Sequence, residues 1–184
     1  MGDAALSEAD LAYLRPAAER ARQFQFYDWT YQAIGQIHEY HEQWDDLLTA
    51  VEQLEELTDR GYPGYAISAY IGLGRLEEVQ RLLEQGDWLP AEDATSLEAG
   101  YLWRGFGRLQ ALQGDLETAY RSLTRSIAIF EKLESRLDIA RTLLFRCRVL
   151  LALSREAEAR QDEQAAFEHF AECGAVIPIG YQPL

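Results

Sequence analysis

The stretch that decides the fold is Gln113-Gly114-Asp115-Leu116-Glu117-Thr118-Ala119, which reads as a tight turn followed by the start of a helix. The same pattern stands 40 residues earlier, as Leu73-Gly74-Arg75-Leu76-Glu77-Glu78-Val79, and 40 residues later, as Leu153-Ser154-Arg155-Glu156-Ala157-Glu158-Ala159. A further copy, Gln43-Trp44-Asp45-Asp46-Leu47, precedes the Arg75 segment by 32 residues. Because self-similarity at a regular period is the signature of repeat architectures, we expect several copies of one helical unit.

Apolar residues between these turns follow a helical period. Leu47, Val51, Leu54 and Leu57 recur at spacings of three and four, which is typical of one face of an amphipathic helix. The one short strand candidate, Ala175 to Ile179, contains a proline. The sequence therefore predicts an all-α fold in a single domain over residues 1–184. We expect an N-terminal helix at 7–26, four helical hairpins at 28–60, 61–86, 93–134 and 136–174, and an extended tail at 175–184.

The side chains inside the third hairpin carry a resemblance to a known family. A large aromatic residue is followed by a small residue in the first helix, and by another small residue and a bulky one in the second, at Trp103, Phe106, Gly107, Ala119 and Leu123. The first hairpin fits the same pattern with Tyr31, Ile34, Gly35, His38 and Val51. The chain thus resembles the tetratricopeptide repeat over residues 28–174, although Pro63 and Ile67, then Leu143 and Cys147, depart from the pattern in the second and fourth hairpins.

This resemblance implies a right-handed αα-superhelix of about four hairpins, in which the first helix of each hairpin lines a concave groove. Gly35 and Gly107 would let the two helices of their hairpins approach closely. The 40-residue spacing exceeds the family's usual repeat length, so we expect the later helices to be longer by one or two turns.

The charge of the chain is uneven and limits its partners. Of 184 residues, 31 are acidic and 17 are lysine or arginine, which gives a formal net charge of −14. Residues 1–100 hold 20 acids and 6 arginines, so this half carries all of the net charge. An acidic protein is a poor ligand for nucleic acid or for an anionic membrane surface, and no apolar run is long enough to span a bilayer.

The origin and the compartment follow from composition. Arginine outnumbers lysine by 16 to 1 and asparagine is absent, which favours a GC-rich bacterial genome. Two cysteines exclude a disulfide scaffold, and no basic region precedes an apolar stretch near residue 1, so we expect a cytoplasmic protein.

No catalytic, cofactor or metal motif stands out. Phosphate-binding loops, dinucleotide fingerprints and nucleophile elbows are absent, so we expect a protein that is not an enzyme and holds no cofactor. His38, His41 and Glu42 share one helical face and have the ligand types of a metal site. Packing of His38 between the helices explains the same residues more simply, so we expect no metal.

Arginines are the most informative candidates for binding. In the register implied by the resemblance, nine side chains point into the groove: Trp29, Gln32, Gln36, Tyr40, Tyr101, Arg104, Arg108, Arg141 and Arg148. Guanidinium groups bind carboxylates and phosphates through paired hydrogen bonds, so the groove would suit an acidic peptide or a free C-terminal carboxylate. Alternatively, these arginines form structural ion pairs with acids such as Glu98, Glu117 or Asp138. The sequence leaves both possibilities open.

Taken with the resemblance, these features favour a non-catalytic protein–protein interaction module, either an adaptor or a scaffold. Two alternatives stay open: a small acidic chaperone for an exported partner, and a ligand-sensing or oligomer-forming module of a regulatory protein. The apolar tail at 175–184 would either cap its own last helix or enter the groove of a neighbouring copy, which would give a homodimer.

Overall fold

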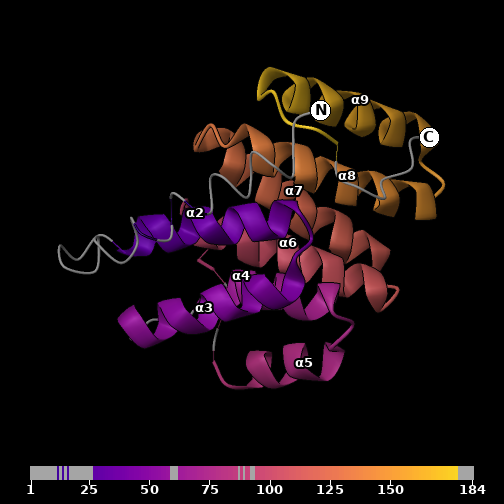
Figure 1. The fold of residues 1–184 in the computed structure, drawn as a ribbon. Helices are drawn as coiled ribbons and strands as arrows, with labels where there is room; N and C mark the ends of the chain where they lie inside the picture. Colours follow the sequence, from indigo (N-terminus) through magenta and orange to yellow (C-terminus); the bar gives the residue numbers. More distant parts are fainter. Residues whose placement is uncertain are drawn as a thin grey trace. The chain divides into compact units, whose positions relative to one another are not determined.

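In a computed structural model of the chain, every secondary-structure element that is described is a helix, so the all-α prediction is confirmed (Figure 1). The structure describes residues 12, 14, 16, 27–58, 62–86, 88, 90–91 and 94–177. The predicted N-terminal helix at 7–26 lies almost wholly outside these residues. The end of the predicted tail, 178–184, lies wholly outside them. The right-handed superhelix remains a prediction.

The chain divides into two compact units, residues 1–85 and 86–184. The first unit holds α2 (Tyr27–Tyr40), α3 (Trp44–Thr58), α4 (Pro63–Gly72) and α5 (Leu76–Glu84). Each helix packs against the next, and α2 also packs against α4. The predicted stripe on α3 turns inward, since Leu47, Val51 and Leu54 are all buried. Ile67 on α4 is fully buried in the same unit.

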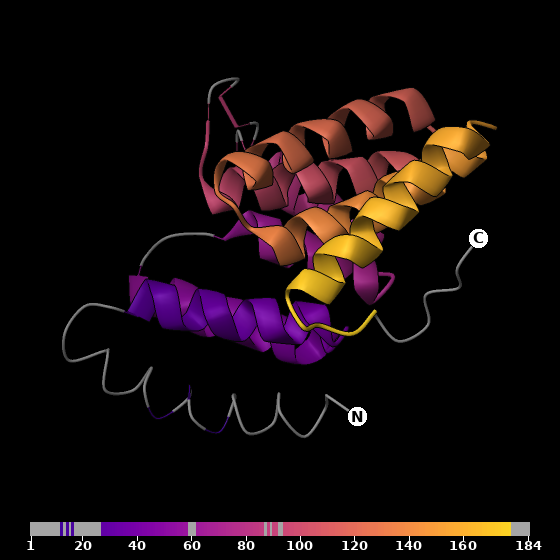
Figure 2. The ribbon, with the colours of Figure 1, turned by 90° about the horizontal axis from the view of Figure 1, so that it is seen from above.

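The second unit holds four longer helices, α6 (Leu97–Leu112), α7 (Leu116–Lys132), α8 (Arg136–Ala152) and α9 (Glu156–Glu172). Consecutive helices pack together, and α6 also packs against α8. Its buried residues include Ala119 and Leu123 on α7, which pack with Val149 on α8. Figures 1 and 2 show α9, coloured yellow, at the edge of this unit beside α8.

One turn geometry recurs after six helices and explains the period of the sequence. In each turn a residue with positive φ follows the helix, and the N–H of the next residue donates to the carbonyl oxygen five positions earlier in the sequence, at 2.8 to 3.0 Å. This is the Schellman arrangement, in which a left-handed residue lets the last carbonyls of a helix find donors. The positive-φ residues are Glu42, Gly74, Gly114, Glu134, Ser154 and Gly174.

In the second unit these left-handed residues stand at regular intervals, from Gly114 through Glu134 and Ser154 to Gly174. Helices α7, α8 and α9 have 17 residues each, and three-residue turns separate them. Two such helices with their turns account for the 40-residue repeat. In the first unit α4 and α5 have only 10 and 9 residues, which agrees with the longer helices expected further along the chain.

The two glycines expected to play the same role differ in their surroundings. A Cβ atom on Gly107 would lie 2.6 Å from Cγ of Leu123 and 3.1 Å from the carbonyl oxygen of Ala119, so α6 and α7 need glycine there. A Cβ atom on Gly35 would lie 3.5 Å from Leu47, which is an ordinary van der Waals contact. The expectation that Gly35 is needed for close approach is therefore wrong, because its neighbours leave room for a methyl group.

This difference predicts opposite effects of the same substitution. Gly107→Ala should lower the free energy of unfolding by about 1–3 kcal/mol, since the added methyl group overpacks the contact with α7. Gly35→Ala should leave that free energy unchanged or raise it by up to about 1 kcal/mol, because alanine favours the helix. Urea unfolding of both variants measures the difference, and equal effects would contradict it.

Candidate functional site

The nine predicted groove residues range from the core to the surface. The side chains of Trp29 and Gln32 lie outside what the structure describes, while Gln36 and Tyr40 on α2 are half-buried. On α6 and α8, the buried side chains are Tyr101, Arg104 and Arg141. Arg108 is half-buried and Arg148 is exposed. The arginines therefore do not form one surface cluster.

Arg104 forms a buried ion pair between α6 and α8. Its Nη1 donates to Oδ1 of Asp138 at 3.0 Å, and the arginine side chain is completely inaccessible to solvent. The Tyr101 hydroxyl donates to Oδ2 of the same carboxylate at 3.2 Å, and the Ser135 hydroxyl donates to it at 2.7 Å. Asp138 thus accepts hydrogen bonds from three side chains, two on α6 and one just before the start of α8.

Aromatic rings complete the enclosure of this guanidinium. Cζ of Arg104 lies 4.9 Å from the ring centroid of Tyr101 and 5.4 Å from that of Phe130. Stacking on aromatic faces and pairing with a carboxylate are the two ways in which a guanidinium is accommodated in a protein interior. Tyr101 and Arg104 are therefore enclosed by the protein itself, and of the two possibilities raised by the sequence, Arg104 forms the structural ion pair.

A second arginine, Arg146 on α8, ties three helices together and was not among the predicted residues. Its Nε and Nη2 donate to the two carboxylate oxygens of Asp162 on α9, each at 2.7 Å, and its Nη1 donates to Thr124 on α7 at 3.1 Å. Desolvation by burial lowers the pKa of Arg146, but the hydrogen bonds and charge of Asp162 outweigh it, so the pKa is raised. The Arg146 guanidinium is therefore a permanent, half-buried cation.

A different arrangement surrounds Arg108, one helical turn beyond Arg104. Cζ of Arg108 lies 4.5 Å from the ring centroid of Phe145 on α8, so the guanidinium stacks on an aromatic ring at the seam of the two helices. Arg148 follows Phe145 by three residues, which places it on the same side of α8, and it is exposed. Leu112, four residues after Arg108 on α6, is 59% exposed.

We call these four residues, Arg108, Leu112, Phe145 and Arg148, the Arg108 face. It combines a half-buried cation fixed on a ring, a second cation at the surface and an exposed apolar side chain. Sequence reasoning found its arginines but missed Phe145 and Leu112. Phe145 has a signal in hindsight, because it stands between Arg141 and Arg148 at helical spacing.

His38, one residue of the possible metal site, is buried and paired with a glutamine side chain. His38 is 2% exposed, and its Nδ1 lies 2.9 Å from Oε1 of Gln43. Within the described part of the chain, no three histidine, cysteine, aspartate or glutamate residues lie close enough to hold a metal ion. Cys147 is buried and Cys173 is exposed, and neither forms a disulfide.

No helix among the residues that the structure describes is both long and apolar enough to cross a bilayer. Comparisons of the chain with protein-family models, with curated proteins and with solved structures found no match.

Proposed function

We propose that this protein is a non-catalytic interaction module, an adaptor or a scaffold, whose Arg108 face binds an acidic segment of a partner protein. The observation that carries the proposal is the stacking of Arg108 on Phe145 beside the exposed Arg148. The tetratricopeptide-like pattern of the hairpins supports the same class of function, with a bacterial cytoplasm as its setting.

The ring of Phe145 orders the Arg108 side chain before any ligand binds. A long arginine side chain loses rotamer freedom when it binds a ligand, and a ring that already holds the guanidinium reduces this loss. A guanidinium that stacks through its flat face can still donate hydrogen bonds from its edge, and a carboxylate pairs with that edge. A carboxylate that reaches Arg108 then also lies near the side of α8 that carries Arg148.

The exposed leucine narrows the chemistry of the partner. Leu112 lies one turn of α6 beyond Arg108, roughly 6 Å along the helix axis. A partner segment that places an apolar side chain near its carboxylates would bury Leu112 while it pairs with the arginines. Apolar anchors beside charged contacts are typical of peptide recognition on helical surfaces.

Charge-reversal variants test this proposal in the full-length chain. The probes are two labelled short peptides that differ only in charge, one with glutamates around a single leucine and one with lysines in their place. Arg108→Glu and Arg148→Glu should each weaken binding of the glutamate peptide by about tenfold or more, since each removes a charge-assisted hydrogen bond. Fluorescence anisotropy measures the dissociation constants.

Arg121→Glu is the matched control, because Arg121 is an exposed arginine on α7 that hydrogen-bonds only locally to Thr118 at 3.1 Å among the contacts described. This variant should bind the glutamate peptide within about twofold of the wild type, because it changes the net charge without changing the Arg108 face. Equal loss in all three variants would mean that only the overall charge matters and would overturn the proposal. Binding that follows leucine content and ignores charge would favour the chaperone alternative.

A further inference from the structure

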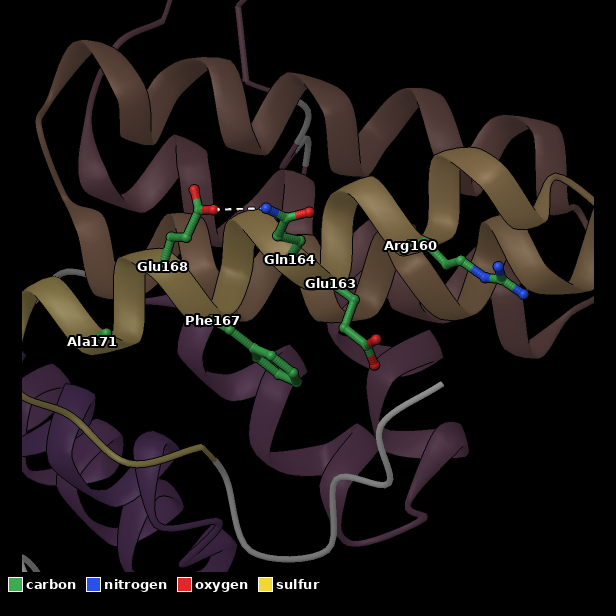
Figure 3. Close-up of a pocket in the computed structure, with 6 residues that line it drawn as sticks. All are labelled: Arg160, Glu163, Gln164, Phe167, Glu168 and Ala171. Carbon is green, nitrogen blue, oxygen red and sulfur yellow. Dashed lines mark hydrogen bonds between the residues drawn. The ribbon is translucent and has the colours of Figure 1, made fainter.

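The side of α9 that points away from α8 carries exposed residues. Among the elements that the structure describes, α9 packs only against α8, through a buried side that includes Ala159, Asp162, Ala166 and Phe170. The opposite side carries six exposed residues at helical spacing: Ala157, Arg160, Gln161, Gln164, Glu168 and Ala171. Several of these also line an open pocket on α9, where Phe167 is half-buried (Figure 3).

Two charged residues of opposite sign stand at equal distances from the middle of the helix on this side. Helix α9 runs from Glu156 to Glu172, so Gln164 is its central residue. Arg160 precedes Gln164 by four positions and Glu168 follows it by four. Arg160 and Glu168 lie roughly 12 Å apart along the axis, which is too far for them to pair within one helix.

We propose that two copies of this chain associate through α9, antiparallel, with a twofold axis at Gln164. In this alignment Arg160 of each copy faces Glu168 of the other, so the pair is made twice. Gln161 then faces Phe167 of the second copy, and Ala157 faces Ala171. A parallel alignment would instead place Arg160 against Arg160, and like charges in contact are destabilising.

The side chains around Gln164 suit this arrangement. Nε2 of Gln164 donates to Oε1 of Glu168 at 3.0 Å, which orders the carboxylate on the outer side of the helix (Figure 3). The second carboxylate oxygen of Glu168 can accept from the arginine of the other copy. The two glutamines lie next to each other at the axis, where neutral amides avoid the repulsion that charged residues would have there.

A second copy is a better occupant than an unrelated protein because the order Arg160, Gln164, Glu168 on the outer side of α9 is its own complement. The interface is small, since it contains one helix from each copy and few apolar residues. Interfaces of this size are weak or transient, so we expect a monomer–dimer equilibrium that depends on protein concentration. This inference is independent of the proposed peptide binding at the Arg108 face.

Sedimentation equilibrium of the full-length chain over a wide concentration range tests the dimer. At about 0.15 M salt the screening length is near 8 Å, so the general negative charge of the two copies is largely screened while the close pairs persist. The wild type should show a mass that rises toward that of a dimer. Arg160→Glu and Glu168→Arg should each raise the dissociation constant by about tenfold, because each change affects both pairs.

The double variant, Arg160→Glu with Glu168→Arg, should restore the wild-type dissociation constant, since it exchanges the two charges and keeps their pairing. Circular dichroism checks that every variant retains its helix content, and Arg121→Glu on α7 should leave the equilibrium unchanged. A wild type that stays monomeric, single variants that dimerise normally, or a double variant that stays monomeric would each overturn the proposal. Dimer loss only on removal of residues 175–184 would show that the tail, not α9, joins the copies.

Discussion

Replacing Asp138 with alanine should lower the free energy of unfolding by about 3–5 kcal/mol, as is typical when one partner of a buried ion pair is removed. Arg104 is fully buried, and its guanidinium would then lie in the protein interior without the carboxylate that accepts its hydrogen bond. The hydroxyls of Tyr101 and Ser135 would lose the same acceptor. Urea unfolding followed by circular dichroism measures the loss.

The control for this variant is Glu117→Ala, which removes an exposed acid from the first turn of α7, as Asp138 lies in the first turn of α8. That substitution should cost less than about 1 kcal/mol, because exposed charges near a helix N-terminus contribute little. The double variant Arg104→Met with Asp138→Leu should recover most of the stability, since an apolar pair of similar size needs no compensating charge. A cost for Asp138→Ala no larger than that of the control would contradict the account of this ion pair.

Replacing Phe130 with alanine should also destabilise the protein by about 3–5 kcal/mol, the usual cost of removing a buried ring. Phe130 is completely buried, and its ring centroid lies 5.3 Å from that of Tyr101. The ring also forms part of the enclosure of Arg104. The loss therefore includes both apolar burial and an aromatic neighbour of the buried cation.

A second substitution makes this prediction specific to the packing of α6 on α7. A Cβ atom on Gly100 would lie 2.5 Å from the Phe130 ring, so Gly100→Ala should destabilise the wild type. In the Phe130→Ala background the same methyl group enters the vacated space and adds helix propensity, so Gly100→Ala should be stabilising there. Thermal unfolding of the four proteins measures the change of sign, and additive effects would contradict the packing described.

The helices and their turns were predictable because both depend on local sequence. Apolar residues at helical spacing fixed the helices, and glycines such as Gly74 and Gly114 marked turns that require positive φ. Glu134 and Ser154 adopt the same backbone conformation without glycine. At Ser154 the 40-residue repeat spacing was a better guide to the turn than the residue type.

The depth of burial was not predictable, because it depends on partners that are distant in the sequence. Arg104 and Arg108 are four residues apart on one side of α6, and sequence reasoning gave them the same role. The former meets Asp138 and is enclosed, whereas the latter stacks on Phe145 and stays partly exposed. The residues of α8 that meet each arginine decide which of the two is exposed. The spacing of the arginines alone does not fix how α8 aligns with α6.

The central claim is that the Arg108 face selects acidic segments, and a reversal of its charge tests this most directly. Anisotropy titrations compare the glutamate and lysine peptides on the wild type and on the double variant Arg108→Glu with Arg148→Glu. The wild type should prefer the glutamate peptide by about tenfold or more, and the double variant should lose this preference or reverse it. A double variant that still prefers the glutamate peptide as strongly as the wild type would contradict the claim.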